Sequence, residues 1–297
     1  MQSLSSRFVG LAVVLLLAFA SLRGAQLPMV AAGDLVRRAV DVEMHPPDEG
    51  TKFIFQDYKK TPAGSSTKVM VQTDEATAGL VVAYNDKPLG PKRRQEEWDR
   101  VKRFIRNPDE LKRKQQQEKQ DRERISQIIR AMPDAFLFEN DGTEPGRAGV
   151  GQAGKELVRL KFRPNPKYDP PSRVEQALTG MEGTILVDAN KNRIARIDGT
   201  LSRQVSFGWG ILGHLDSGGH ILVEQGEVGG GHWMITRMDL SFTGRLLLFR
   251  SINVQSTEMY SDFKAMNGPM TFAQGLDKLK EQEAQWLERQ QKKVAQK

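Results

Sequence analysis

The chain has 297 residues, a formal net charge of +7 and no cysteine. The absence of cysteine excludes a disulfide framework, a cysteine nucleophile and a lipid-modified N-terminal cysteine, so a folded domain has to be held by its own hydrophobic core. The excess of Lys and Arg is concentrated in residues 91–132 and comes without a motif for nucleic-acid recognition. We therefore expect no nucleic acid as a partner.

The first residues have the pattern of a secretory signal peptide. Arg7 precedes an apolar run over residues 8–20, and small residues follow it. We predict a signal peptide at residues 1–20, cleaved after Ala20 or as late as Ala32, and a periplasmic mature protein. The alternative is an uncleaved anchor in the inner membrane, although the run is short for a membrane-spanning helix.

Residues 34–289 are predicted to form one domain, which begins with a helix and a set of strands. Asp34 can cap a helix whose apolar residues recur at helical spacing. Three candidate strands follow, at residues 52–58, 68–73 and 79–84. We expect them to pair as an antiparallel set.

A long helical segment is predicted within residues 91–132, with a break at Asn107 and Pro108. Its two ends carry apolar stripes, but residues 112–124 contain no apolar residue, which is typical of a helix solvated on every side. We interpret this stretch as an exposed arm. The alternative is that its positive charge meets anionic lipid or an acidic protein partner. The candidate contacts are Lys112, Arg113 and Lys114.

Shorter elements are expected between this segment and the next block of strands. Two strands are predicted at residues 135–139 and 157–162, separated by a polar, glycine-rich loop. Prolines then exclude regular pairing, and Ser172 can cap a short helix that ends near Gly180. At the end of the chain a helix begins after Pro269, and the tail at residues 290–297 is expected to fray.

Residues 181–254 repeat strand and turn signals without interruption. A hairpin is predicted at residues 184–197, with Asp and Asn residues at its turn. Further candidate strands lie at residues 204–209, 220–227, 232–242 and 245–254. Because short connections join neighbouring antiparallel strands, the block is predicted to be an antiparallel meander and the fold class to be α+β.

The last strands of this block carry large apolar side chains on both faces. An antiparallel sheet with one face in water alternates apolar and polar residues, so two apolar faces imply that each is covered. Two interpretations are open: an ordinary two-layer core, or a curved sheet around an apolar cavity. The candidate lining residues of such a cavity are Phe207, Trp209, Met234, Met238, Leu240, Phe242, Leu247 and Phe249.

Several short motifs stand close together in the second half of the chain. They are Phe162-Arg163-Pro164-Asn165-Pro166, Asp169-Pro170-Pro171-Ser172-Arg173, Met181-Glu182-Gly183, Ile197-Asp198-Gly199, Phe207-Gly208-Trp209-Gly210 and Ser261-Asp262-Phe263. As a set they resemble a group of exported bacterial proteins of uncharacterised role, which are similar to outer-membrane lipoprotein-sorting proteins. The resemblance implies the fold of the LolA, LolB and RseB proteins, a curved antiparallel half-barrel with helices on its concave side. The charged helical segment at residues 91–132 is then an insertion, and no acyl-binding residue of that fold is matched position by position.

No constellation of residues indicates catalysis or a metal site. Neither Ser206 nor Ser217 stands in the glycine-flanked elbow of a serine hydrolase. The spacing of His214, His220 and His232 fits no compact pattern of metal ligands. We expect a non-enzymatic protein without a metal or a cofactor.

The expected function is noncovalent binding of a hydrophobic ligand, a lipid or the acyl chains of a lipoprotein, by a periplasmic monomer. Its affinity would come from burial, at roughly 0.8 kcal/mol for each methylene group removed from water. The alternative is a regulatory or scaffold module of the cell envelope, which binds a protein partner through its basic helical segment.

Overall fold

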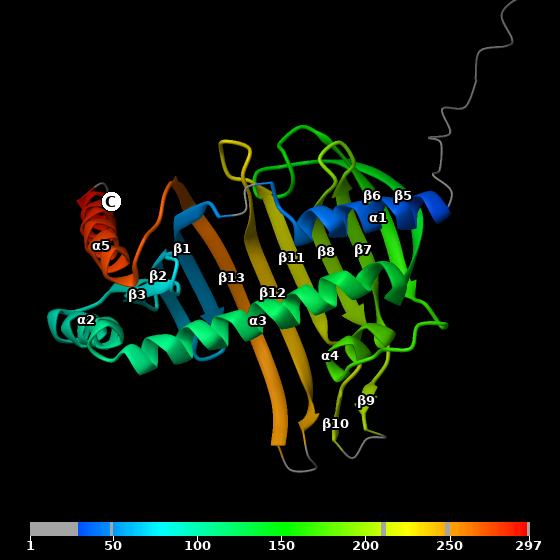
Figure 1. Cartoon of the computed structure of the whole chain (residues 1–297), viewed down its shortest axis with the longest axis horizontal. Helices are drawn as coiled ribbons and strands as arrows, with labels where there is room; N and C mark the ends of the chain where they lie inside the picture. Colours follow the sequence, from blue (N-terminus) through cyan, green and yellow to red (C-terminus); the bar gives the residue numbers. More distant parts are fainter. Residues whose placement is uncertain (1–28, 48–49, 209–211, 247–249, 296–297) are drawn as a thin grey trace, which may run out of the picture.

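The computed structural model describes residues 29–47, 50–208, 212–246 and 250–295. These residues form an α+β fold on one large, curved and open antiparallel sheet, which confirms the predicted fold class (Figure 1). The predicted signal peptide lies outside the described residues. Among the helices that are described, none is both long enough and apolar enough to span a membrane.

The sheet has thirteen strands in the spatial order β4-β3-β2-β1-β13-β12-β11-β8-β7-β6-β5, with β10 beside β12 and β9 beside β10. Because β13 pairs with β1, the first and last strands of the chain lie side by side in the middle of the sheet. The strands are β1 (Lys52–Thr61), β2 (Gly64–Val71), β3 (Ala78–Tyr84), β4 (Lys87–Pro88), β5 (Phe136–Pro145), β6 (Glu156–Pro164), β7 (Met181–Asp188), β8 (Arg193–Leu201), β9 (Val205–Phe207), β10 (Gly213–Leu215), β11 (His220–Glu227), β12 (Trp233–Leu246) and β13 (Arg250–Met266).

The helices are α1 (Met29–Met44), α2 (Pro91–Arg106), α3 (Pro108–Ala135), α4 (Arg173–Gln176) and α5 (Phe272–Ala295), with a 3-10 turn, η1 (Ala177–Gly180), after α4. The predicted break between α2 and α3 is confirmed. The Asn107 side chain accepts a hydrogen bond from the backbone N–H of Glu110, and Pro108 occupies the first turn of α3, where its missing N–H costs nothing. Figure 1 shows α1 and α3 crossing one face of the sheet, which we call the helix-facing side.

The main core lies on the helix-facing side, between α1, α3 and strands β5–β8. Val36 of α1 and Leu160, Ile185 and Val187 of the sheet are fully buried there. A buried ion pair adds to the anchoring of α1, since Arg193 Nε lies 3.1 Å from Glu43 Oε1 and Gln225 donates to the same oxygen at 2.7 Å. Burial raises the pKa of Glu43, against the attraction of Arg193.

A second core lies at the other end of the sheet and on its other face. Val69 and Val71 of β2 pack there with apolar residues of α5. Lys68 and Met70, which alternate with them, point to the opposite face and line a cavity with α2 and α3. Helix α5 therefore covers the face of β2 that points away from α3, while Phe272 at its start also lines the cavity.

Two expectations about element boundaries are wrong. β5 continues to Pro145 through the expected loop, because Gly142 (φ 96°) allows the register shift between Asn140 and Thr143. β12 runs through the expected turn at Gly244. A Cβ atom at Gly244 would lie 2.2 Å from the carbonyl oxygen of His214. Glycine is therefore needed at this position because β10 approaches β12 closely, and it does not mark a turn. Helix α5 extends to Ala295, and the fraying expected from residue 290 stays a prediction.

Candidate ligand-binding face

Strands β11 and β12 carry apolar side chains on the helix-facing side. The register pairs Ile221 with Leu240 and Val223 with Met238, and directly paired residues point to the same face of a sheet. Ile221 packs against the main core. Met238 and Leu240 therefore face the same side as that core and α1.

These side chains are only partly buried. Val223, Met238, Leu240 and Ile252 are of intermediate exposure, and Val254, which pairs with Phe242, is 41% exposed. Neither the main core nor the core under α5 includes any of them. We call this set the floor: Val223, Met238, Leu240, Ile252 and Val254.

The helix above the floor brings it no apolar cover. Helix α3 packs against α2 and against α1, α4 and β5, while Figure 1 shows its middle crossing β12 and β13. Residues 112–124 of this helix contain no apolar side chain. The floor is thus an apolar strip beside the main core, and Figure 1 shows a polar stretch of helix passing over it.

Several predicted cavity residues lie at this floor or at its border. Met238 and Leu240 belong to it, and Phe242 lies on the same side, at the border where it packs against the main core. Phe207 packs against that core as well. The other predicted residues Trp209, Leu247 and Phe249 lie outside the described residues.

Met234, which was predicted to line the same cavity as Met238, lies on the other face of β12. Met238 pairs with Val223 and Met234 pairs with Gly226. These partners are three residues apart on β11, so they point to opposite faces. The cause is a β-bulge, because one extra residue in β12 shifts the alternation of its side chains.

Beside the floor, the helix-facing side becomes polar. Glu258 of β13 pairs with Met238 on one side and with Lys59 of β1 on the other. Lys59 Nζ lies 2.7 Å from Glu258 Oε1, and the hydroxyl of Tyr260 donates to Glu258 Oε2 at 2.6 Å. Burial opposes ionisation of Glu258, but the hydrogen bonds from Lys59 and Tyr260 outweigh it and lower the pKa of this carboxyl.

Asp57 adds a second carboxyl to these polar residues. We call the set the polar row: Asp57, Lys59, Lys68, Glu258 and Tyr260. Asp57 pairs with Tyr260 across the sheet and is 7% exposed. Lys68 Nζ lies 3.5 Å from Asp57 Oδ2, whereas Oδ1 has no hydrogen-bond partner among the described residues. Burial raises the pKa of Asp57, against the attraction of Lys68. The row can therefore offer both donors and acceptors to the polar end of a molecule lying on the floor.

The polar row was not predicted from the sequence. Its members come from β1, β2 and β13, which are far apart along the chain and meet only through the pairing of β1 with β13. The one local signal was Asp57 in the strand predicted at residues 52–58, with Lys59 directly after that strand. That signal alone does not tell a solvated face from a helix-covered one.

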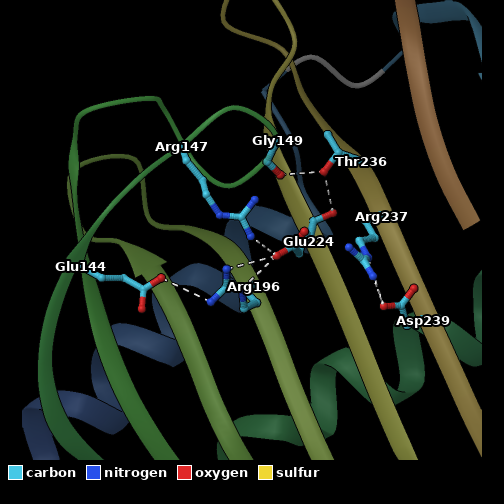
Figure 2. A network of polar contacts seen from close by, with 8 residues as sticks. All are labelled: Glu144, Arg147, Gly149, Arg196, Glu224, Thr236, Arg237 and Asp239. Atoms are coloured by element: carbon cyan, nitrogen blue, oxygen red, sulfur yellow. Dashed lines mark hydrogen bonds and ion pairs between the residues drawn. The ribbon is translucent and has the colours of Figure 1, made fainter. Parts of the chain in front are cut away.

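On the other face of the same strands, charged residues hold a loop in place. Figure 2 shows Glu224 between two guanidinium groups, with Arg147 Nη2 donating to Oε1 at 2.6 Å and Arg196 Nε donating to it at 3.1 Å. The hydroxyl of Thr236 donates to the carbonyl oxygen of Gly149 at 2.6 Å. We assign this network the structural role of fixing the loop after β5 on the sheet.

The three cations predicted as partner contacts separate into two groups. Lys112 and Arg113 are exposed and make no ion pair within the described part of the chain. Lys114 is less exposed: its Nζ lies 2.7 Å from Glu118 Oε1 and 6.0 Å from the centre of the Phe104 ring. Only the first two present their charge at the surface.

The histidines have separate surroundings. His214 Nε2 lies 3.3 Å from Asp216, and His220 Nε2 lies 2.9 Å from Asp198. The ring of His232 meets that of Phe53 edge-on at 5.3 Å. Within the described ranges, no group of three or more His, Cys, Asp or Glu residues is placed to hold a metal ion.

Comparisons with known proteins return little. No family model matches the chain, and no curated protein matches it. Among solved structures, a DUF1329 family protein from Desulfovibrio piger aligns with 82% of this chain and 95% of its own, at 12% sequence identity and a TM-score of 0.29. The function proposed below therefore rests on the geometry of this chain.

Proposed function

We propose that the protein binds a hydrophobic ligand, such as a lipid or the acyl chains of a lipoprotein, on the floor under α3 and without covalent chemistry. The observation that carries this proposal is the partial exposure of Met238 and Leu240 on the helix-covered side of the sheet. Each Å² of apolar surface that a ligand and the floor remove from water contributes about 25 cal/mol. A ligand on the floor would therefore supply the burial of apolar surface that α3 does not supply.

Helix α3 would act as a strap that retains the ligand. Near its start, Arg103 Nε of α2 lies 3.0 Å from Glu110 Oε2. Near its end, Gln127 donates to Glu175 Oε1 at 2.7 Å. With both ends held, the polar middle faces solvent outward and leaves the floor to a guest molecule.

The proposal includes export to the periplasm, a monomeric state and no catalysis or cofactor. The apolar N-terminal run supports export, because it has the order of a signal peptide. The motifs that resemble exported proteins similar to lipoprotein-sorting proteins favour the same class of ligand.

A substitution in the floor tests the proposal. The fluorescent apolar probe N-phenyl-1-naphthylamine should bind the mature protein, and Leu240→Asp should weaken its binding at least about tenfold, because a carboxylate against an apolar ligand costs more than about 1.4 kcal/mol. Ser241→Asp is the matched control, since Ser241 is the exposed next residue of β12 and points to the other face. Equal probe binding by the two folded variants would contradict the proposed site.

Mass spectrometry of the protein purified from its envelope without detergent tests the ligand class. A lipid or lipoprotein bound in stoichiometric amount is the expected result, and organic extraction should release it. A clean apo mass, followed by no uptake on adding lipid, would argue against a carrier.

A second function, binding of an acidic envelope partner, is favoured by the exposure of Lys112 and Arg113 on α3. Replacing both by Glu should abolish capture of that partner and leave probe binding unchanged, because neither residue belongs to the floor. Loss of probe binding in this variant would link α3 to the ligand instead of to a partner.

A further inference from the structure

A separate cavity of about 340 Å³ lies on the helix-facing side at the β2–β3 end of the sheet. Strands β2 and β3 form one wall, and α2, the start of α3 and the start of α5 form the rest. It contains no residue of the floor, so it is a distinct candidate site. Its volume is at the small end of the range of about 300–1,000 Å³ that is typical of small-molecule pockets.

Apolar side chains form one part of the cavity wall. They come from β2, β3, α2 and α5, and two of them, Phe104 and Phe272, are in edge-to-face contact at 5.8 Å between ring centres. The apolar lining residues are Met70, Val81, Val101, Phe104 and Phe272. Such a wall suits a hydrocarbon chain.

Three cations from three different elements also line the cavity: Lys68 of β2, Arg100 of α2 and Lys114 of α3. Glu97 is the one carboxylate in the lining, and it is engaged by Arg100, whose Nε and Nη2 donate to Glu97 Oε2 at 3.0 and 2.8 Å. The two lysines have carboxylate partners outside the lining. Within the lining, three cations therefore stand against one carboxylate.

Both lysines keep donors for a ligand. An ammonium group has three N–H donors, and Lys114 uses one of them on Glu118 Oε1 at 2.7 Å. Lys68 lies 3.5 Å from Asp57 Oδ2, longer than an ordinary hydrogen bond. Glu118 is also held by the backbone N–H of Thr77 at 3.0 Å, so it does not depend on Lys114 alone.

We infer that this cavity binds a single-chain amphiphile with an anionic end, whose carboxylate or phosphate lies against Lys68 and Lys114 and whose hydrocarbon lies against Met70, Val81 and Phe104. The small volume favours one chain over two. The cavity shares no residue with the floor, but it shares Lys68 with the polar row beside the floor, so Lys114 is the cation that belongs to the cavity alone.

Calorimetric titration with dodecanoate, dodecyl phosphate and dodecanol tests the inference. The mature protein should bind an anionic amphiphile roughly tenfold more tightly than dodecanol, and added salt should reduce that preference. The better of the two anionic probes identifies the head group. Equal affinity for all three probes would overturn the inference.

The variant Lys114→Met should abolish the preference for the anionic probe, while Lys112→Met, an exposed residue of the same helix, should retain it. A second variant, Asp57→Asn with Lys68→Met, removes the other cation together with its buried partner and should also reduce the preference. If both keep it, the inference fails. If Leu240→Asp loses anionic binding and the cavity variants do not, the ligand lies on the floor and the assignment of the cavity is wrong.

Discussion

The helix-facing side of the sheet is closed at one end and open in its middle. In β7, Ile185 and Val187 are fully buried, whereas Met238 and Leu240 of β12 are only partly buried. The strands are apolar at both places, so the difference lies in the cover. Helix α1 brings a buried apolar stripe, while residues 112–124 of α3 bring none. An apolar strand face shows that cover is needed, and only the facing element shows whether the chain itself supplies it.

The largest effect on stability is expected from breaking the ion pair that anchors α1 over the main core. Arg193→Met leaves Glu43 buried without its cation, and we expect a loss of about 3 kcal/mol in the free energy of unfolding at neutral pH. Urea unfolding measures it. Arg147→Met is the control, because Glu224 keeps Arg196 and the Arg147 side chain is exposed.

The same variant has a predicted pH dependence. Burial holds the pKa of Glu43 above its ordinary value of 4.5, so the ionised carboxyl destabilises the native state at neutral pH. That penalty should disappear as the pH falls through the native pKa towards 4.5. Arg193→Met should therefore recover part of its stability on acidification, and a loss that is constant with pH would show that Glu43 is not its cause.

A pair of truncations compares the closed and open regions directly. Ile185→Ala should cost about 3 kcal/mol, because it leaves a cavity in a closed core. Leu240→Ala should cost about 1 kcal/mol or less, because a partly exposed side chain loses less buried area and water can fill the space. Urea unfolding of the ligand-free protein measures both. Equal losses would mean that the floor is covered in solution.

The smallest effect concerns the polar row. Because burial raises the native pKa of Asp57 above its ordinary value of 3.8, the ionised carboxyl destabilises the fold above the native pKa. Asp57→Asn should therefore be more stable than the wild type at neutral pH, by about 1 kcal/mol at most. This advantage should vanish on acidification towards the ordinary pKa. A variant less stable than the wild type at neutral pH would show that the ion pair with Lys68 outweighs the burial cost.

Much of the fold could be predicted from local patterns, but less of the candidate site. β11 was predicted at its observed bounds, and the break at Asn107 follows from its capping side chain and the proline after it. Of the cavity candidates, Met238 and Leu240 lie on the floor, whereas Met234 does not. The β-bulge in β12 turns the Met234 side chain to the other face of the sheet, and no local sequence pattern marks the bulged residue.

Local sequence was sufficient wherever the physical cause acts within a few residues. Helix periodicity, caps, turns and strand alternation are of this kind, and so is the polar character of residues 112–124 of α3. Tertiary structure alone decided the pairing of β1 with β13, the polar row that this pairing assembles and the position of α3 over the floor. The reason is that burial and hydrogen bonding between segments far apart in the chain select strand partners and facing helices. The residue spacing within one segment carries no information about which distant segment it will pair with.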